Sequence, residues 1–103
     1  MIAIINNGNP CICNDSGIMM NRLYPNGARC ISMSPNQKYI AAGFDDCVKI
    51  YSLPNGYMTY NIIILNGPVA AVSFRDEQSV VVSYRKGGGG VFSINGSLLA
   101  SFY

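Results

Sequence analysis

Residues 28–63 read ARCISMSPNQKYIAAGFDDCVKIYSLPNGYMTYNII, and residues 68–103 read PVAAVSFRDEQSVVVSYRKGGGGVFSINGSLLASFY. In both stretches, short runs rich in Val, Ile, Tyr, Phe and Ala alternate with polar turns, and helical periodicity is absent. The two stretches align, with CISMS on AVSFR, KYIAAG on SVVVSY, and VKIYSLPNG on GVFSING. Each stretch therefore predicts one copy of the same four-stranded β unit.

Asn-Gly pairs mark the turns between these runs, at residues 7–8, 26–27, 55–56, 66–67 and 95–96. Because Asn-Gly tolerates the positive φ angles of tight turns, we expect each pair to close a hairpin. Asn26 and Asn66 are 40 residues apart, and so are Asn55 and Asn95. A period of about 40 residues with four short strands predicts the blades of a β-propeller.

The predicted fold class is all-β, with antiparallel four-stranded blades and about two and three-quarter blades in total. An earlier unit, residues 1–26, fits the last three strands of the pattern, and complete blades follow at 27–65 and 66–103. Together they make residues 1–103 one partial propeller. The expected strands lie near 1–6, 10–14, 17–23, 28–34, 38–43, 47–53, 57–64, 69–74, 79–84, 89–94 and 98–103.

The segment ISMSPNQKYIAAGFDDCVKIYSL, residues 31–53, resembles the WD40 repeat family. It has a strand ending in Ser-Pro, a polar turn, an apolar strand, an Asp turn and a strand of the Val-Lys-Ile type. Tyr51 and Ser52 occupy the place of the signature Trp-Asp pair, and Phe92 and Ser93 take that place in the next blade. The resemblance implies a non-enzymatic scaffold that binds other proteins.

The chain departs from the family where a histidine is usual. In the family a Gly-His pair precedes the innermost strand, and its His bonds the Asp of the later turn. This chain has no histidine. Asp45 matches the family Asp, whereas its equivalent in the next blade falls at about Lys86. We therefore expect blades held by apolar packing and strand ladders.

A second resemblance concerns residues 91–103, VFSINGSLLASFY. This segment looks like the terminal propeller blades of BEACH-domain trafficking proteins. It implies that the scaffold belongs to a membrane-trafficking protein of that type.

Two and three-quarter blades are too few to close a ring, since propellers have typically four to eight blades. Open ends would expose apolar strands, which is an aggregation hazard. The chain is therefore a fragment of a longer reading frame, a truncated product, or an oligomer that completes its ring in trans; the start within a blade favours the first two. The alternative function is thus a self-assembling structural β protein.

Composition narrows the class of protein. Half of the 103 residues are hydrophobic and 12% are charged, which predicts one ordered domain with a net charge of +2. The longest apolar run, residues 62–65, is strand-sized, and the first residues lack a basic leader, so we expect a cytoplasmic protein without membrane insertion.

The four cysteines are expected to be reduced, buried, small apolar residues. They are Cys11, Cys13, Cys30 and Cys47.

Enzyme chemistry is not expected. General acid–base catalysis most often recruits His, and the acidic pairs 45–46 and 76–77 fall in predicted turns. In RKGGGG, residues 85–90, the basic pair precedes the glycines, unlike a phosphate-binding loop. We therefore predict no catalytic residue, no metal site and no cofactor.

The expected binding site is the face formed by the loops before each innermost strand and by the second-to-third-strand hairpins. That face should present Asn26, Phe44, Asp46, Asn66, Tyr84, Arg85 and Lys86. Exposed Phe, Tyr and Arg are frequent interface anchors. The predicted partner-binding residues are Phe44, Asp46, Tyr84, Arg85 and Lys86. Phe44 could equally cover its own blade, and residues 84–86 could instead stack on single-stranded nucleic acid.

Overall fold

The structure, a computed structural model, describes residues 1–53, 55–63 and 67–102. In these ranges it contains eleven strands and no helix, which confirms the all-β prediction. The strands are β1 Ile2–Asn6, β2 Asn9–Cys13, β3 Met19–Arg22, β4 Cys30–Met33, β5 Tyr39–Gly43, β6 Cys47–Ser52, β7 Tyr57–Ile63, β8 Val69–Asp76, β9 Ser79–Tyr84, β10 Gly89–Ser93 and β11 Leu98–Phe102.

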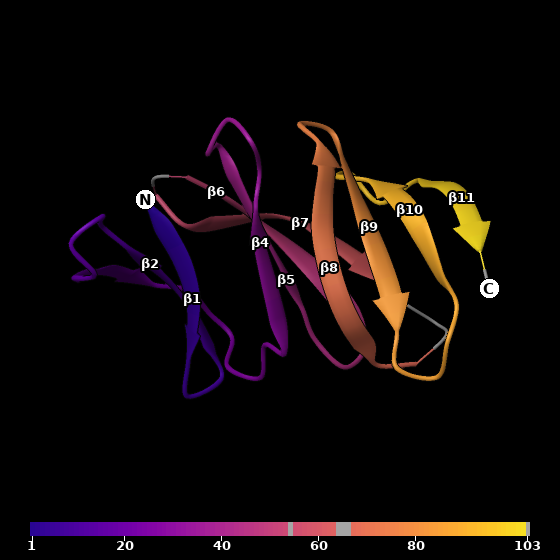
Figure 1. The fold of residues 1–103 in the computed structure, drawn as a ribbon, viewed down its shortest axis with the longest axis horizontal. Coiled ribbons are helices and arrows are strands. Elements are labelled where there is room, and N and C mark those ends of the chain that lie inside the picture. Colours follow the sequence, from indigo (N-terminus) through magenta and orange to yellow (C-terminus); the bar gives the residue numbers. More distant parts are fainter. Residues whose placement is uncertain (54, 64–66, 103) are drawn as a thin grey trace.

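The strands form three antiparallel sheets that follow one another along the chain (Figure 1). Blade 1 has the order β1-β2-β3, blade 2 has β4-β5-β6-β7, and blade 3 has β8-β9-β10-β11. Strand β4 contacts β8 of the next sheet and β1 of the preceding one, so the sheets stack side by side. Three strands in the first sheet and four in each of the others are the number predicted.

The Asn-Gly turns serve two different purposes. Pairs 7–8, 55–56 and 95–96 join neighbouring strands of one sheet, as predicted. Asn26-Gly27 instead lies in the β3–β4 connection between blades, and Gly67 lies between β7 and β8, so the expectation of a hairpin there is wrong. Asn66 lies outside the described residues. The glycine of all five pairs has a positive φ, between 80° and 106°, which explains why glycine recurs there.

One irregularity in strand pairing repeats in all three blades and shows which residues of the blades are equivalent. The pairing register shifts between Ile12 and Cys13, between Ile50 and Tyr51, and between Val91 and Phe92, each time opposite the outermost strand. Tyr51 and Phe92 each follow this shift and are therefore equivalent. Because Tyr51 pairs with Ile40 and Phe92 pairs with Val80, Ile40 and Val80 are equivalent as well. The sequence alignment of KYIAAG on SVVVSY is therefore wrong by one residue.

Two turns of different length explain this error. The connection between Met33 and Ile40 is one residue longer than that between Phe74 and Val80. The β5–β6 turn closes with a bond from the Phe44 N–H to the Cys47 oxygen, whereas the β9–β10 turn is one residue longer. The two differences in turn length cancel. The spacing between β6 and β10 therefore equals that between β4 and β8, and only β9 is shifted by one residue against β5. As a result Arg85, and not Lys86, is the equivalent of Asp45.

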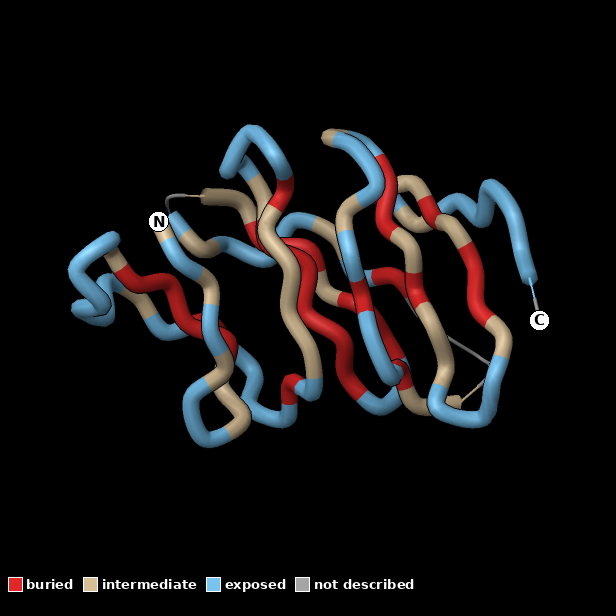
Figure 2. Tube along the Cα trace, viewed as in Figure 1, coloured by how far each residue is buried: buried red, intermediate tan, exposed pale blue. Residues whose placement is uncertain are grey.

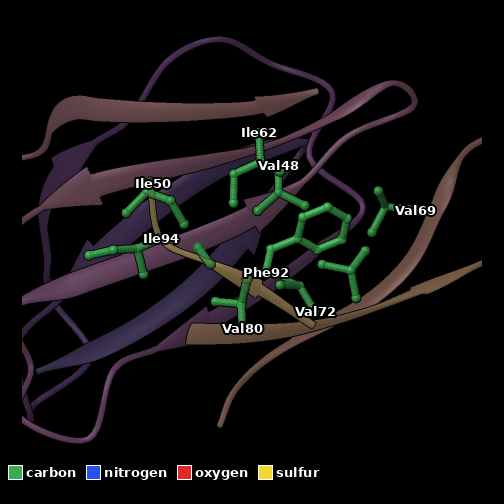
Figure 3. Packing of buried hydrophobic residues seen from close by; sticks show 10 residues of the cluster. Val48, Ile50, Ile62, Val69, Val72, Val80, Phe92 and Ile94 are labelled. Carbon is green, nitrogen blue, oxygen red and sulfur yellow. The ribbon is translucent and has the colours of Figure 1, made fainter. Parts of the chain in front are cut away.

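Two apolar cores fill the spaces between the blades (Figure 2). The core between blades 2 and 3 brings Val48, Ile50 and Ile62 against Val80, Phe92 and Ile94 (Figure 3). The core between blades 1 and 2 contains Ile12, Leu23, Ile40, Ala42, Phe44 and Tyr51. Apolar packing between sheets therefore carries the fold, as the absence of histidine predicted.

The cysteines belong to this packing. Cys11, Cys13 and Cys47 are buried, Cys30 is half-buried, and all four are free thiols. Burial raises the pKa of the Cys30 and Cys47 thiols, because the charged thiolate loses its hydration. The prediction of small buried apolar residues is confirmed for three of the four.

Candidate interaction site

A hollow of about 470 Å³ opens on the predicted loop face. One wall comes from the β3–β4 connection, with Pro25, Asn26 and Gly27. The other wall comes from the β5–β6 turn and the start of β6, with Phe44, Asp45, Asp46, Cys47 and Lys49. Residues 26, 44 and 46, which the sequence analysis places on one face, line this hollow together.

Side-chain bonds fix the first wall. The Asn26 amide donates to the Asn7 carbonyl oxygen over 2.8 Å and to the Asn9 side-chain oxygen over 2.9 Å. The N–H groups of Gly27 and Ala28 both donate to the Gly8 carbonyl oxygen. The connection is therefore fastened to the β1–β2 turn of the preceding blade.

An ion pair joins the two walls. The Nε of Arg29, just before β4, donates to the Asp45 carboxylate in the β5–β6 turn. This hydrogen bond lowers the pKa of Asp45 and raises the pKa of Arg29. The pair links the connection before the innermost strand to the later Asp turn, which is the link that the WD40 resemblance assigns to a histidine.

Phe44 does not offer its ring to solvent. It is only 6% exposed and packs in the core between blades 1 and 2, so the expectation of an exposed anchor is wrong and its covering role is the one observed. The Lys49 ammonium lies 5.7 Å from the ring centroid, a distance suited to a cation–π contact. Phe44 thus forms the apolar floor of the hollow.

The other predicted residues lie on the β9–β10 turn. Arg85 and Lys86 are exposed, and Tyr84 is half-buried. The Arg85 N–H donates to the Pro68 carbonyl oxygen over 2.9 Å, which fastens this turn to the connection before β8. The Arg85 charge also lies close enough to Asp45 to contribute to the lowering of the pKa of Asp45. Asp45 and Arg85 therefore lie on one face of adjacent blades, and Asp46 follows Asp45 in the same turn.

Arg29 is the residue that sequence reasoning missed. Nothing in the local sequence joins Arg29 to Asp45, because the two residues are 16 positions apart. Its place directly before an innermost strand, where the family carries Gly-His, was the available signal. Only the pairing of β4 with β5 brings positions 29 and 45 together.

Other kinds of site find no support in the part of the chain that the structure describes. Across residues 1–53, 55–63 and 67–102 no three metal-ligating side chains gather. Within the same ranges, no helix is long and apolar enough to cross a membrane.

Comparison with known proteins identifies the fold. No protein-family model and no curated protein matches the chain. Among solved structures it matches the crystal structure of the WD40 repeats of RRP9, with a TM-score of 0.79 and 16% identity. The match covers 94% of this chain and 33% of that one. The protein therefore has the fold of a WD40 β-propeller fragment and spans about a third of the length of the structure it matches.

Proposed function

We propose that the protein is a non-enzymatic scaffold that binds an extended segment of another protein across its loop face. The observation that carries the proposal is the hollow between the β3–β4 connection and the β5–β6 turn. It combines an apolar floor, Phe44, with an exposed carboxylate, Asp46, while Arg85 and Lys86 stand on the next blade. An apolar pocket with charged groups of both signs at its rim suits a peptide better than a flat protein surface.

A displayed library of random peptides, selected on the purified chain, tests this proposal. We expect the selected peptides to lose at least tenfold in affinity with Asp46→Lys and with Arg85→Glu. The matched control is Lys38→Glu, which reverses an exposed charge on the β4–β5 turn away from the hollow and should leave affinity unchanged. Phe44 is unsuitable as a test position because its removal would open the core.

The proposal fails if no peptide is selected, or if Lys38→Glu weakens binding as much as the two loop-face variants do. Binding of a labelled single-stranded oligonucleotide through Tyr84, Arg85 and Lys86, falling steeply with salt, would instead support the nucleic-acid alternative.

A narrower version of the proposal places the scaffold in a cytoplasmic trafficking protein of the BEACH type. It is supported by the resemblance of residues 91–103 to the terminal blades of such proteins. Sequencing the transcript on both sides of this reading frame tests it. A BEACH domain encoded upstream is expected, and flanks that contain neither that domain nor further 40-residue units would contradict it.

A further inference from the structure

The Asn-Gly pairs are chemically reactive as well as turn-forming. The backbone nitrogen of the glycine can attack the side-chain amide carbon of the asparagine, since glycine has no Cβ to shield it. A C–N bond forms, ammonia leaves, and a succinimide ring remains. Water then opens the ring at either carbonyl and leaves an aspartyl or an isoaspartyl residue. The overall change is the hydrolysis of an amide, and water is the only co-reactant.

The reaction needs a glycine N–H that is free to lose its proton and to turn toward the asparagine side chain. A hydrogen bond from this N–H to a carbonyl oxygen opposes both. Gly27, Gly56 and Gly96 carry such a bond, because their N–H groups donate over 2.8, 2.7 and 2.9 Å to main-chain carbonyl oxygens. Their nitrogens are therefore held away from the preceding asparagines.

Gly8 differs because it is the second central residue of the β1–β2 turn. Asn7 and Gly8 have φ angles of 53° and 83°, and Asn6 pairs with Asn9 across the turn. In a hairpin loop of this length the flanking pair makes the closing bonds, so the central N–H groups point outward. Among the described residues, the Gly8 N–H has no hydrogen-bond partner.

The geometry of the turn, and not the neighbouring sheets, leaves this N–H free. The β5–β6 turn has the same length, and the repeated pairing places Asp46 at the position of Gly8. Blade 2 lies between two other sheets. Even so, the Asp46 N–H also has no hydrogen-bond partner within the described ranges.

The asparagine side chains add to this difference. The Asn26 amide donates to two oxygens, and the Asn95 side-chain oxygen accepts from the Ser93 hydroxyl and the Ser97 N–H. Asn7 is exposed. We infer that Asn7 is the preferred site of spontaneous deamidation among the pairs 7–8, 26–27, 55–56 and 95–96, both residues of which the structure describes.

Deamidation at Asn7 acts on the first wall of the hollow. The Asn7 carbonyl oxygen accepts from the Asn26 amide, and the Gly8 carbonyl oxygen accepts from the N–H groups of Gly27 and Ala28. An isoaspartyl link carries the main chain through the side-chain methylene, so the turn lengthens and both acceptors move. The β3–β4 connection then loses the bonds that fasten it to the β1–β2 turn.

Ageing the purified chain in mildly alkaline buffer at body temperature, followed by mass spectrometry of proteolytic peptides, tests the inference. Deamidated forms should accumulate at Asn7 about tenfold faster than at Asn26, Asn55 or Asn95. The control is the same chain in concentrated urea, where the hydrogen bonds are lost and the four rates should converge. Equal rates in the folded chain, a faster reaction at one of the other three sites, or a preference for Asn7 that persists in urea would overturn the inference.

Amide hydrogen exchange tests the effect on the wall. The Gly27 and Ala28 amides should exchange about tenfold faster in chains that carry an isoaspartyl residue at position 7, on the order of the loss of a hydrogen bond. Asn7→Asp adds the charge without the methylene and should keep the slow exchange of the fresh wild type. Asn7→Gly removes the reactive amide and suits the positive φ, so its exchange should not change on ageing. Slow exchange in the isoaspartyl chains would contradict the loosening of the wall.

Discussion

The hydroxyl of Tyr51 donates a hydrogen bond of 2.9 Å to the carbonyl oxygen of Tyr24. Tyr51 stands in β6 and is 1% exposed, while Tyr24 lies in the connection between blades 1 and 2. The ring therefore fills the core between blades 1 and 2, and its hydroxyl fastens the connection that forms one wall of the hollow.

Replacing Tyr51 separates these two roles. Tyr51→Phe keeps the ring and removes the bond, so we expect a loss of about 1 kcal/mol in the free energy of unfolding. Phe92 occupies the equivalent position in blade 3, which indicates that the ring alone is tolerated. Tyr51→Ala should cost more, about 3–5 kcal/mol, because it leaves a cavity. Urea unfolding at pH 7 measures both, and equal losses would contradict the separation.

Alkaline pH should act on the same residue. Burial raises the pKa of Tyr51 well above its usual value of about 10. Above pH 10 the Tyr51 hydroxyl loses its proton in the unfolded chain and keeps it in the folded chain. The contribution of Tyr51 to the free energy of unfolding is therefore complete below pH 10 and decreases as the pH rises. The advantage of the wild type over Tyr51→Phe should therefore shrink from pH 9 to pH 11. An advantage that stays constant over this range would contradict the burial effect.

The Arg29–Asp45 pair should respond to acid. Because the guanidinium bond lowers the pKa of Asp45, its stabilising contribution is present above the ordinary carboxyl range and is lost as pH falls through the lowered value. Asp45→Asn should lower the unfolding midpoint slightly at pH 7 and have no effect near pH 2. Both side chains are exposed, so about 0.5 M salt should screen their attraction. The difference in unfolding midpoint between the wild type and Asp45→Asn should therefore also decrease in salt.

A double-mutant cycle with Arg29→Gln provides the control for this pair. Coupling between positions 29 and 45 should be present at pH 7 and absent near pH 2. Coupling that persists at acid pH would show that packing, and not charge, links the two walls.

Gly89 should tolerate no side chain. A Cβ at this position of β10 would lie 2.8 Å from the Phe102 ring and would meet the Val82 carbonyl oxygen. Because a backbone oxygen cannot step aside, Gly89→Ala should lower the free energy of unfolding by about 2–3 kcal/mol. Gly87→Ala is the matched control: its Cβ meets no atom, and only the positive φ of 104° costs about 1–2 kcal/mol. A smaller loss at Gly89 than at Gly87 would contradict this packing.

Among the predicted binding residues, the sequence predicts the exposure of Asp46, Arg85 and Lys86 correctly and that of Phe44 wrongly. Asp46, Arg85 and Lys86 were placed on exposed turns because polar residues in hairpin turns face water. Phe44 follows β5 in such a turn, yet its ring returns to the core between blades. Whether a side chain at a turn points into the core depends on the space that the neighbouring sheet leaves for it. The local sequence does not contain that information.

By itself the sequence determined the strands, three of the five Asn-Gly hairpins and the forty-residue period, because these depend on local chemistry: branched and aromatic runs favour extended backbone, and glycine permits positive φ. Only the tertiary structure decided how the blades correspond, since two compensating one-residue differences in turn length hide the shift of β9 against β5. It also decided the Arg29–Asp45 pair and the buried position of Phe44. These features arise from strand pairing and sheet stacking, which join residues far apart in the chain.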